Sequence, residues 1–349
     1  MTRADRRGTL ATLGLGAVGL AAGFLAERRF VHPRLSADVG LPRPSAPAEE
    51  LTVPGPGALP LGVERRGPAG APQLVLVHGW LCSTRVWDPV VERLSGTHRL
   101  IAHDQPGHGR TPRPPDGRYD LDLLGDALLA VIEGATEPGE LVLVGHSLGG
   151  MTVLNALRRH HDRLAGRVHA TVLVSTTSSA RRDPAERRRL ELGIRAFANL
   201  QRVLSPLATG LRRPGIIDVA ARLTGTTSDL STLITRVVGL GPDADAAVAE
   251  ATTRMVLGAG PDPALGLVEA VLGLDEDAAL ALLPPSTAVV GSADRLTPPV
   301  LTHRMARRAG GRLDVVELPR VGHLPPFEAP DALVAVLRSR TSAVDAAAA

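Results

Sequence analysis

The stretch that decides the fold lies at residues 141–150 and reads Leu-Val-Leu-Val-Gly-His-Ser-Leu-Gly-Gly. Four consecutive apolar residues predict a strand that is buried on both faces of a sheet. The pattern G-x-S-x-G follows this strand directly, and helix-like sequence comes after it. Between a strand and a helix, this pattern predicts a tight turn that exposes the Ser147 hydroxyl, with glycines where side chains would clash. The helix N-terminus behind Ser147 would favour negative charge at that point. We therefore predict that Ser147 is a nucleophile.

Short apolar runs and helical stretches alternate on both sides of this turn. The predicted strands are residues 61–66, 73–78, 99–104, 140–145, 168–175, 287–291 and 312–318. The predicted helices are residues 83–94, 120–134, 148–160, 299–308 and 329–338. Alternation of this kind predicts an α/β fold, with a mostly parallel sheet and helices on both faces.

One long interval interrupts this alternation. Residues 179–284 are helix-like and contain no convincing strand, so we predict a helical cap inserted into the core. The core itself is predicted at residues 61–178 and 285–340, with a frayed tail at residues 341–349. Residues 31–60 are rich in Pro, Ala and Gly. They predict a linker, with room for one short edge strand near residues 51–53.

The N-terminal segment contains an uncharged apolar run at residues 8–26, with arginines on both sides. As a helix it would be roughly 28 Å long, close to the thickness of a bilayer core. Residues 1–30 therefore predict a single-pass anchor in the cell membrane, although a cleaved export signal and a buried helix remain open. The run also contains a G-x-G-x-x-G pattern at residues 14–19. That pattern binds dinucleotides only between a strand and a helix, so we do not interpret it as a nucleotide site.

The composition excludes several classes of protein. The sequence pI is about 10.1, but the net charge is only +3, because all 39 basic residues are arginines, which stay ionised beyond the lysine range. No aromatic-studded basic stripe is apparent, so we expect no nucleic acid as a partner. Cys82 is the only cysteine, which excludes an intramolecular disulfide and a cysteine-based metal cluster.

Two further residues complete a candidate catalytic set. A serine hydroxyl is a weak nucleophile until a base takes its proton, and that base must be held in place. Asp294 follows the predicted strand 287–291, and His323 follows the predicted strand 312–318. Both thus lie at the carboxyl ends of strands, where open α/β sheets place their sites. We predict His323 as the base and Asp294 as the acid that orients it; the alternative for Asp294 is a helix cap near residue 298.

The remaining requirement is an oxyanion hole with two hydrogen-bond donors. The main-chain N–H of Leu148, directly after the nucleophile, is one predicted donor. The main-chain N–H of Trp80, in the loop after the strand 73–78, is the other. The side chains of Trp80 and His146 are predicted to contact the substrate. This chemistry requires no metal ion and no organic cofactor.

These motifs together resemble the α/β-hydrolase superfamily over residues 61–340, and within it bacterial lipase- and esterase-like members. The matching segments are residues 78–80, 104–109, 145–150, 291–294 and 322–323. The resemblance implies an eight-stranded type of sheet, an inserted helical cap, and structural roles for His103 and His108. Epoxide hydrolases and haloalkane dehalogenases of this superfamily carry an aspartate as nucleophile, and Ser147 argues against both.

The expected function is hydrolysis of a carboxylic ester through an acyl-enzyme, with a small hydrophobic ester as the substrate. The first alternative is a cofactor-free haloperoxidase or perhydrolase, since such members of the superfamily use the same triad. The second alternative is a binding protein that kept the fold without catalysis.

Overall fold

The computed structural model describes residues 44–46, 48–180, 188, 232–259 and 261–348. The predicted N-terminal anchor lies outside the described residues, as do residues 31–43 and 47 of the predicted linker and residues 181–187, 189–231 and 260 of the predicted cap. The core of the predicted α/β fold lies within them.

The centre of the molecule is one eight-stranded sheet with the order β1-β2-β4-β3-β5-β6-β7-β8. Strand β2 is antiparallel to β1 and β4, and all neighbouring strands from β4 to β8 are parallel. The strands are β1 Glu49–Pro54, β2 Pro60–Arg66, β3 Gln73–Val77, β4 Arg99–His103, β5 Leu141–His146, β6 Val168–Val174, β7 Ser286–Gly291 and β8 Leu313–Leu318. The predicted fold class is therefore confirmed.

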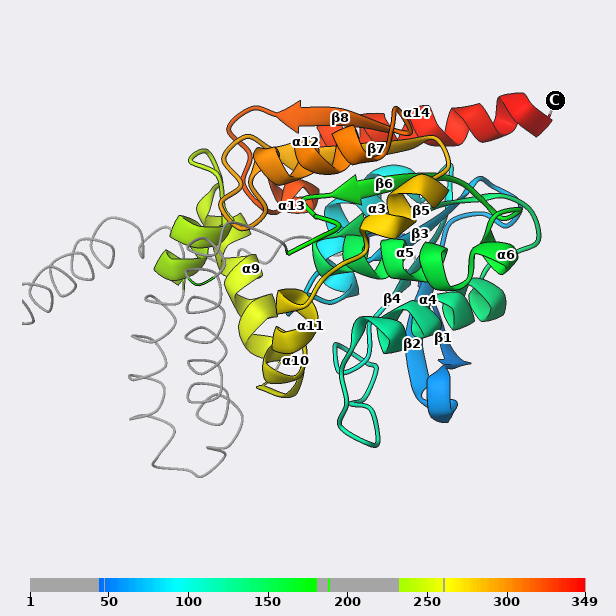
Figure 1. Ribbon diagram of the computed structural model, residues 1–349, viewed down its shortest axis with the longest axis horizontal. Helices are drawn as coiled ribbons and strands as arrows, with labels where there is room; N and C mark the ends of the chain where they lie inside the picture. The colour runs from blue at the N-terminus through cyan, green and yellow to red at the C-terminus, as the bar shows by residue number, and fades with distance from the viewer. Residues whose placement is uncertain (1–43, 47, 181–187, 189–231, 260, 349) are drawn as a thin grey trace, which may run out of the picture.

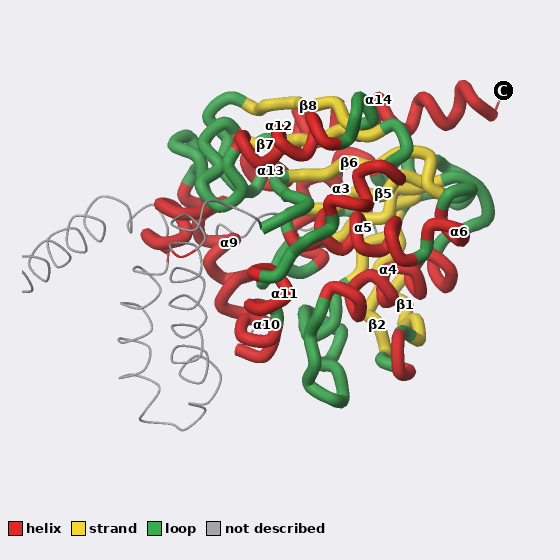
Figure 2. Tube along the Cα trace, viewed as in Figure 1, coloured by secondary structure: helices red, strands yellow, loops and turns green. Residues whose placement is uncertain are grey.

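Helices cover both faces of this sheet (Figures 1 and 2). Helices α4 and α5 cover one face, while α3 and α14 cover the other. The helices are η1 Pro56–Ala58, η2 Thr84–Trp87, α3 Asp88–Leu94, α4 Leu121–Ala135, α5 Leu148–Arg159, α6 His161–Leu164, α9 Ala246–Gly258, α10 Pro261–Gly266, α11 Val268–Leu272, η3 Asp277–Leu282, α12 Pro299–Arg308, α13 Pro325–Glu328 and α14 Pro330–Ala348.

Alternate residues of each central strand pack on opposite faces, as the period of a strand requires. In β3, Val75 and Val77 join the apolar cluster beneath α4 and α5, whereas Leu74 and Leu76 join the cluster beneath α3 and α14. All five residues of β3 are buried. This double burial explains why the strand sequence is a continuous apolar run.

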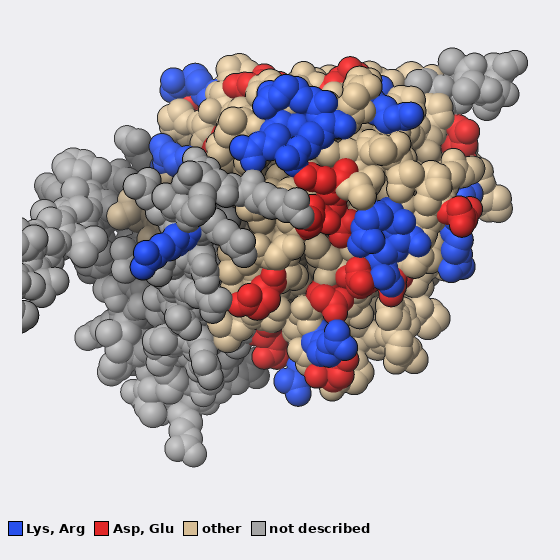
Figure 3. Space-filling view, viewed as in Figure 1, with Lys and Arg blue, Asp and Glu red and all other residues tan. Residues whose placement is uncertain are grey.

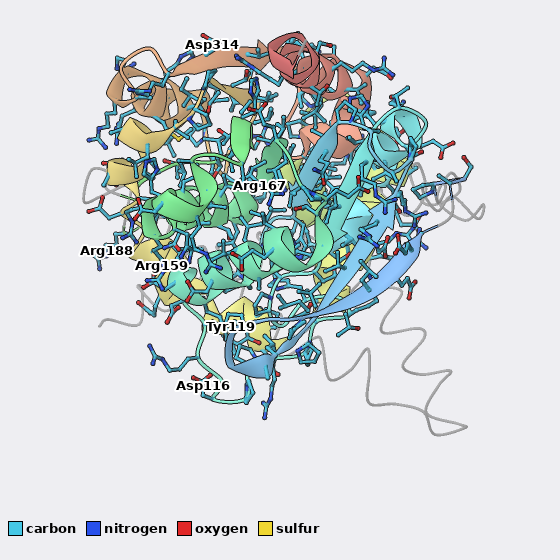
Figure 4. All side chains as sticks on the ribbon, turned by 90° about the vertical axis from the view of Figure 1, so that its right-hand side faces the viewer. Asp116, Tyr119, Arg159, Arg167, Arg188 and Asp314 are labelled. Carbon is cyan, nitrogen blue, oxygen red and sulfur yellow. The ribbon has the colours of Figure 1, made fainter. Side chains whose placement is uncertain are left out.

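The carboxyl ends of the parallel strands face the insertion between β6 and β7. Figure 1 shows the arrowheads of β6 and β8 directed toward the side of the molecule where α9, α10 and α11 lie. Figure 4 is turned so that the opposite end of the molecule faces the viewer, and Arg167 is labelled there. Its guanidinium donates to the main-chain oxygens of Glu137 and Gly139 and ties the loops at that end together. The ends of the sheet therefore differ: one is closed by loops, and the other faces the inserted helices.

Two boundaries differ from the sequence prediction. Strand β1 pairs with β2 from Glu49 onward, so part of the stretch interpreted as a linker belongs to the sheet. Helix α14 continues to Ala348, through residues predicted as a frayed tail. Thr341 on this helix is buried, and its hydroxyl lies 2.9 Å from His98 Nε2. This contact holds the helix against the core beyond its expected end.

The localisation predicted from the sequence has to be corrected. A membrane span requires about 20 predominantly apolar residues in one helix. Within the part of the chain that the structure describes, no helix is both long and apolar enough to cross a bilayer. Residues 8–26, on which the prediction of a cell-membrane anchor rested, lie outside that part. The prediction of a cell-membrane anchor is therefore withdrawn.

Charged side chains of both signs share the surface. Figure 3 shows arginine side chains lying close to acidic ones over the described part of the face that it draws. Ion pairs join Arg159 to Asp126 and Arg340 to Asp314 at 3.0 and 2.6 Å. Pairing of this kind agrees with the small net charge of +3.

Candidate active site

The turn between β5 and α5 holds Ser147 in a strained backbone conformation. Its φ and ψ are 52° and −117°, in a region that residues with a side chain rarely adopt and that costs about 1–3 kcal/mol. Its main-chain N–H donates to Val174 O at 2.8 Å, and the Thr176 hydroxyl donates to Ser147 O at 2.7 Å. These contacts from β6 and the loop after it hold the turn in place, at the end of the strand.

Both glycines of the G-x-S-x-G pattern are required by close packing. A Cβ on Gly145 would lie 2.5 Å from Gly149 O, and a Cβ on Gly149 would lie 2.1 Å from Val77 O. Neither distance is tolerable for a carbon atom. The glycines therefore allow α5 to begin directly against β3, as the sequence pattern predicts.

Three side chains from separate strand ends meet at this turn. His323 Nε2 lies 3.0 Å from Ser147 Oγ, within hydrogen-bond reach. The other ring nitrogen of His323, Nδ1, lies 3.0 and 3.1 Å from the two carboxylate oxygens of Asp294. Asp294 follows β7 and His323 follows β8, although 147 residues separate Ser147 from Asp294 in the sequence (294 − 147). The structure thus brings together the three residues predicted as a catalytic set.

The Asp294 carboxylate is held by its own loop. Its Oδ1 accepts hydrogen bonds from the main-chain N–H groups of Leu296 and Thr297, both at 2.9 Å, and its Oδ2 accepts one from the Thr297 hydroxyl at 2.8 Å. Burial would raise the pKa of this carboxyl, but the His323 ring and the bonds from His323 and Thr297 outweigh burial and hold the pKa below its ordinary value. Asp294 therefore stays ionised beside the imidazole that it orients.

Main-chain contacts position His323. Glu328 accepts hydrogen bonds from the N–H groups of Gly322 and Leu324, both at 3.0 Å, on either side of the histidine. His323 N–H donates to Gly239 O at 2.8 Å. The histidine loop is thus fixed by a carboxylate from α13 and by the segment before α9.

His146 lies behind His323 in the structure. It is 1% exposed, and its Nε2 donates to the main-chain oxygen of His323 at 2.8 Å. The sequence prediction placed His146 in contact with the substrate. In the structure its described contact is with the backbone of the histidine loop instead, because the alternation of β5 turns it into the core.

Trp80 and Leu148 present the two predicted oxyanion donors. Among the described residues, neither main-chain N–H has an acceptor. The Trp80 indole Nε1 donates to Pro263 O in α10 at 2.9 Å, and its ring packs against apolar residues of α11. The loop that carries one donor is therefore attached to the inserted helices. Free N–H groups beside Ser147 are what the transition state of acyl transfer requires.

The described residues offer few groups for metal binding or for catalysis by a thiol. In the described ranges, no three His, Cys, Asp or Glu side chains are grouped in a way that could hold a metal ion. Cys82 is buried, and burial raises the pKa of its thiol to about 12, so it stays protonated. Among the described residues, the Ser147 hydroxyl is the group that lies beside Nε2 of the His323 ring.

A family comparison agrees with the geometry. The model of the alpha/beta hydrolase family matches residues 74–336 of the chain. The chain belongs to this family. The match extends over β3 to α14, and it includes all three side chains that meet at the turn.

Several relatives of this chain carry names of enzymes. A pimeloyl-[acyl-carrier protein] methyl ester esterase of Aeromonas hydrophila is 32% identical over 117 residues, which are 34% of this chain and 42% of that protein. A non-heme chloroperoxidase of Burkholderia pyrrocinia is 38% identical over 110 residues, 31% of this chain and 38% of that protein. The chain thus aligns with about two fifths of the length of these curated relatives.

The fold of one solved structure is similar to that of this chain over most of its length. The esterase of Thermogutta terrifontis has a TM-score of 0.66 and 23% sequence identity to it. The alignment covers 85% of this chain and 99% of that one. At this identity the likeness concerns the fold.

Because several histidines are buried, we predict that the folded state of this protein is destabilised by acid. His78, His103, His108 and His146 are buried, and burial lowers the pKa of these rings to about 3, 4, 3 and 3. In the unfolded chain each would bind a proton near pH 6.5, so the unfolded state binds more protons between pH 6.5 and about 4. The free energy of unfolding should therefore fall as the pH drops through this window, by about 1.4 kcal/mol per pH unit for each histidine. Urea unfolding at pH 7, 6 and 5 measures this slope.

His103→Leu supplies the control for this prediction. The ring nitrogens of His103 have no partner among the described residues, so leucine removes one titrating group without breaking a hydrogen bond. The free energy of unfolding should then depend less steeply on pH, by the contribution of one histidine, which is about 1.4 kcal/mol per pH unit. A free energy of unfolding that does not change between pH 7 and 5 would contradict the prediction.

Proposed function

We propose that this chain is a serine hydrolase that cleaves a carboxylic ester through an acyl-enzyme, with Ser147 as nucleophile, His323 as general base and Asp294 as orienting acid. The carrying observation is the 3.0 Å distance between His323 Nε2 and Ser147 Oγ, with Asp294 on the other side of the same ring. This arrangement fits the roles that activate a serine.

The reaction follows from the positions of these atoms. Ser147 Oγ attacks the ester carbonyl while His323 Nε2 takes its proton, and the N–H groups of Trp80 and Leu148 donate to the oxygen that becomes negative. The alcohol leaves with the proton held by His323. A water molecule then gives its proton to His323 and attacks the acyl-enzyme, which releases the acid and restores Ser147.

The described surroundings of Ser147 favour a small hydrophobic ester. Leu148, Met151 and Leu267 form an apolar cluster against which Trp80 packs. Apolar walls bind hydrocarbon groups by removing their surface from water. In this proposal residues 179–284 form a cap over the substrate, and the relatives named as esterases support the ester bond as the target.

A second function is favoured by one observation. The chain is 38% identical over 110 residues to a protein named non-heme chloroperoxidase. Perhydrolysis would use the same residues, with hydrogen peroxide in place of water in the second step. The product would be a peroxy acid, which oxidises bromide without further help from the protein.

A graded panel of p-nitrophenyl esters, from acetate to decanoate, tests the proposal. We expect hydrolysis of at least the shorter apolar esters, and covalent labelling of the peptide that contains Ser147 by a fluorophosphonate probe. Peroxide-dependent bromination in acetate buffer with little ester cleavage would favour the perhydrolase instead. Folded protein that neither cleaves an ester nor reacts with the probe would be a binding protein with this fold.

A further inference from the structure

A buried polar network lies behind the Trp80 loop, outside the triad. His78 and Gln105 are fully buried. The Gln105 main-chain N–H donates to His78 Nε2 at 2.9 Å, and the Gln105 side-chain amide donates to His78 O at 2.6 Å. The segment after β4 thus holds both the ring and the main chain of the residue that follows β3.

This network determines which nitrogen of His78 carries its proton. Because Nε2 accepts from Gln105, the single hydrogen of the neutral ring must lie on Nδ1. Nδ1 lies 2.8 Å from Gly79 O and donates to it. Burial lowers the pKa of the ring to about 3, so it stays neutral at the pH of an assay.

Two donors hold Gly79 O and set the direction of the Trp80 N–H: His78 Nδ1 at 2.8 Å, and the main-chain N–H of Cys82 at 3.1 Å. Gly79 C=O and Trp80 N–H belong to the same peptide group, in which the two bonds point in opposite directions when the peptide is trans. A donor that holds Gly79 O from one side therefore aims Trp80 N–H to the other side. A Cβ on Gly79 would lie 3.2 Å from Ser147 Cβ, so this peptide lies directly beside the nucleophile.

The network also reaches the second predicted donor. The Gln105 side-chain oxygen accepts a hydrogen bond from the Thr152 hydroxyl at 2.8 Å, and Thr152 lies one turn after Leu148 in α5. Gln105 thus connects the loop that carries the Trp80 N–H to the first turn of the helix that carries the Leu148 N–H. The distance between the two donors depends on this connection.

We propose that His78 and Gln105 are positioning residues of the oxyanion hole: His78 aims the Trp80 N–H by holding Gly79 O, and Gln105 fixes the tautomer of His78 and the spacing of the two donors. This proposal rests on the proposed function, since an oxyanion hole is needed only for acyl transfer. Neither residue touches the substrate.

Two substitutions of His78 differ in whether the new side chain can donate a hydrogen bond to Gly79 O. In His78→Asn the amide nitrogen is bonded to Cγ, as Nδ1 is, and it can still donate to Gly79 O. In His78→Gln the amide lies one bond farther out, where it can accept from the Gln105 N–H but does not reach Gly79 O. We expect kcat for p-nitrophenyl acetate to fall about 100-fold in His78→Gln with KM changed less than about threefold, since one of two oxyanion donors is misaimed. In His78→Asn kcat should stay within about fivefold of the parent.

A tetrahedral inhibitor gives a readout that a purely structural role would not change. The affinity for phenylboronic acid, whose adduct places an oxygen in the hole, should fall with kcat in His78→Gln and be retained in His78→Asn. Gln105→Met removes the bond to His78 O and the bridge to Thr152, and we expect about a tenfold loss of kcat at unchanged KM. Equal losses in His78→Asn and His78→Gln, or losses in KM alone, would overturn the proposal. If the parent protein cleaves no ester at all, the proposed function fails instead, so the two failures are distinguishable.

Discussion

Replacing Ser147 with alanine is expected to lower kcat for ester cleavage by about a million-fold, to the level left by binding and the oxyanion hole alone. In the proposed mechanism this hydroxyl oxygen forms the acyl-enzyme, and alanine has no atom that can do so. The fold should remain, because among the described residues the Ser147 side chain hydrogen-bonds only to His323 Nε2, and the turn is held through its main chain. Initial rates with p-nitrophenyl acetate and labelling by a fluorophosphonate probe measure this loss.

Ser175→Ala is the matched control for this substitution. Ser175 also follows a strand of the sheet, is buried and has a positive φ of 46°, but its hydroxyl has no partner among the described residues. We expect its kcat to stay within about threefold of the parent, because no step of the reaction uses this hydroxyl. Labelling that persists in Ser147→Ala, or that is lost in Ser175→Ala, would show that the nucleophile has been assigned to the wrong serine.

The sequence predicted the three residues of the set because each follows a strand in a recognisable way. Ser147 sits in G-x-S-x-G after a doubly buried strand, and Asp294 and His323 follow two later strands. Parallel strands with helical crossovers place their carboxyl ends at one edge of a sheet, so strand order alone predicts proximity. The distances of 3.0 Å between side-chain atoms depend on loop conformations and could come only from the structure.

The residues that support this set were missed for a common physical reason. Thr297, Glu328 and Gln105 act on main-chain groups or buried side chains of the loops around the set, and such contacts leave no periodic signal in a sequence. Thr297 had the strongest local signal, since a hydroxyl three residues after a loop aspartate often hydrogen-bonds to it. Glu328 and Gln105 carry no comparable pattern.

Two boundaries of the fold differ from the prediction: the edge strand expected near residues 51–53 extends over Glu49–Pro54, and the last helix extends to Ala348. Strand β1 ends in a proline and is followed by Pro56, so its stretch resembles a linker, yet edge strands are where a sheet tolerates proline. The Ala-rich end of α14 has a high helix propensity that outweighs the fraying expected of a terminus. Pairing with β2 thus decides the extent of β1, whereas local propensity decides the end of α14.

Replacing Asp294 with asparagine is expected to lower kcat about 10,000-fold while the fold is retained. The reason lies in the hydrogen bonds of this carboxylate. Its Oδ1 accepts two main-chain N–H groups, so the oxygen of an asparagine amide must take that position. The amide nitrogen is then left at the position of Oδ2, 3.0 Å from His323 Nδ1, where it offers a donor to the ring, while the amide oxygen stays 3.1 Å from the same ring nitrogen.

An amide donor at Nδ1 reverses the tautomer of His323. The proton of the neutral ring then lies on Nε2 and points at Ser147 Oγ, so the histidine offers a donor where the reaction requires an acceptor. Thr297→Val separates this effect from loss of packing, since it removes the bond to Oδ2 but leaves a carboxylate beside the ring. We expect Thr297→Val to lose less than about tenfold in kcat, which steady-state kinetics on both variants would measure. If Asp294→Asn instead kept kcat within tenfold of the parent, the orienting charge would have to come from another residue, because a histidine held in the wrong tautomer cannot accept the serine proton.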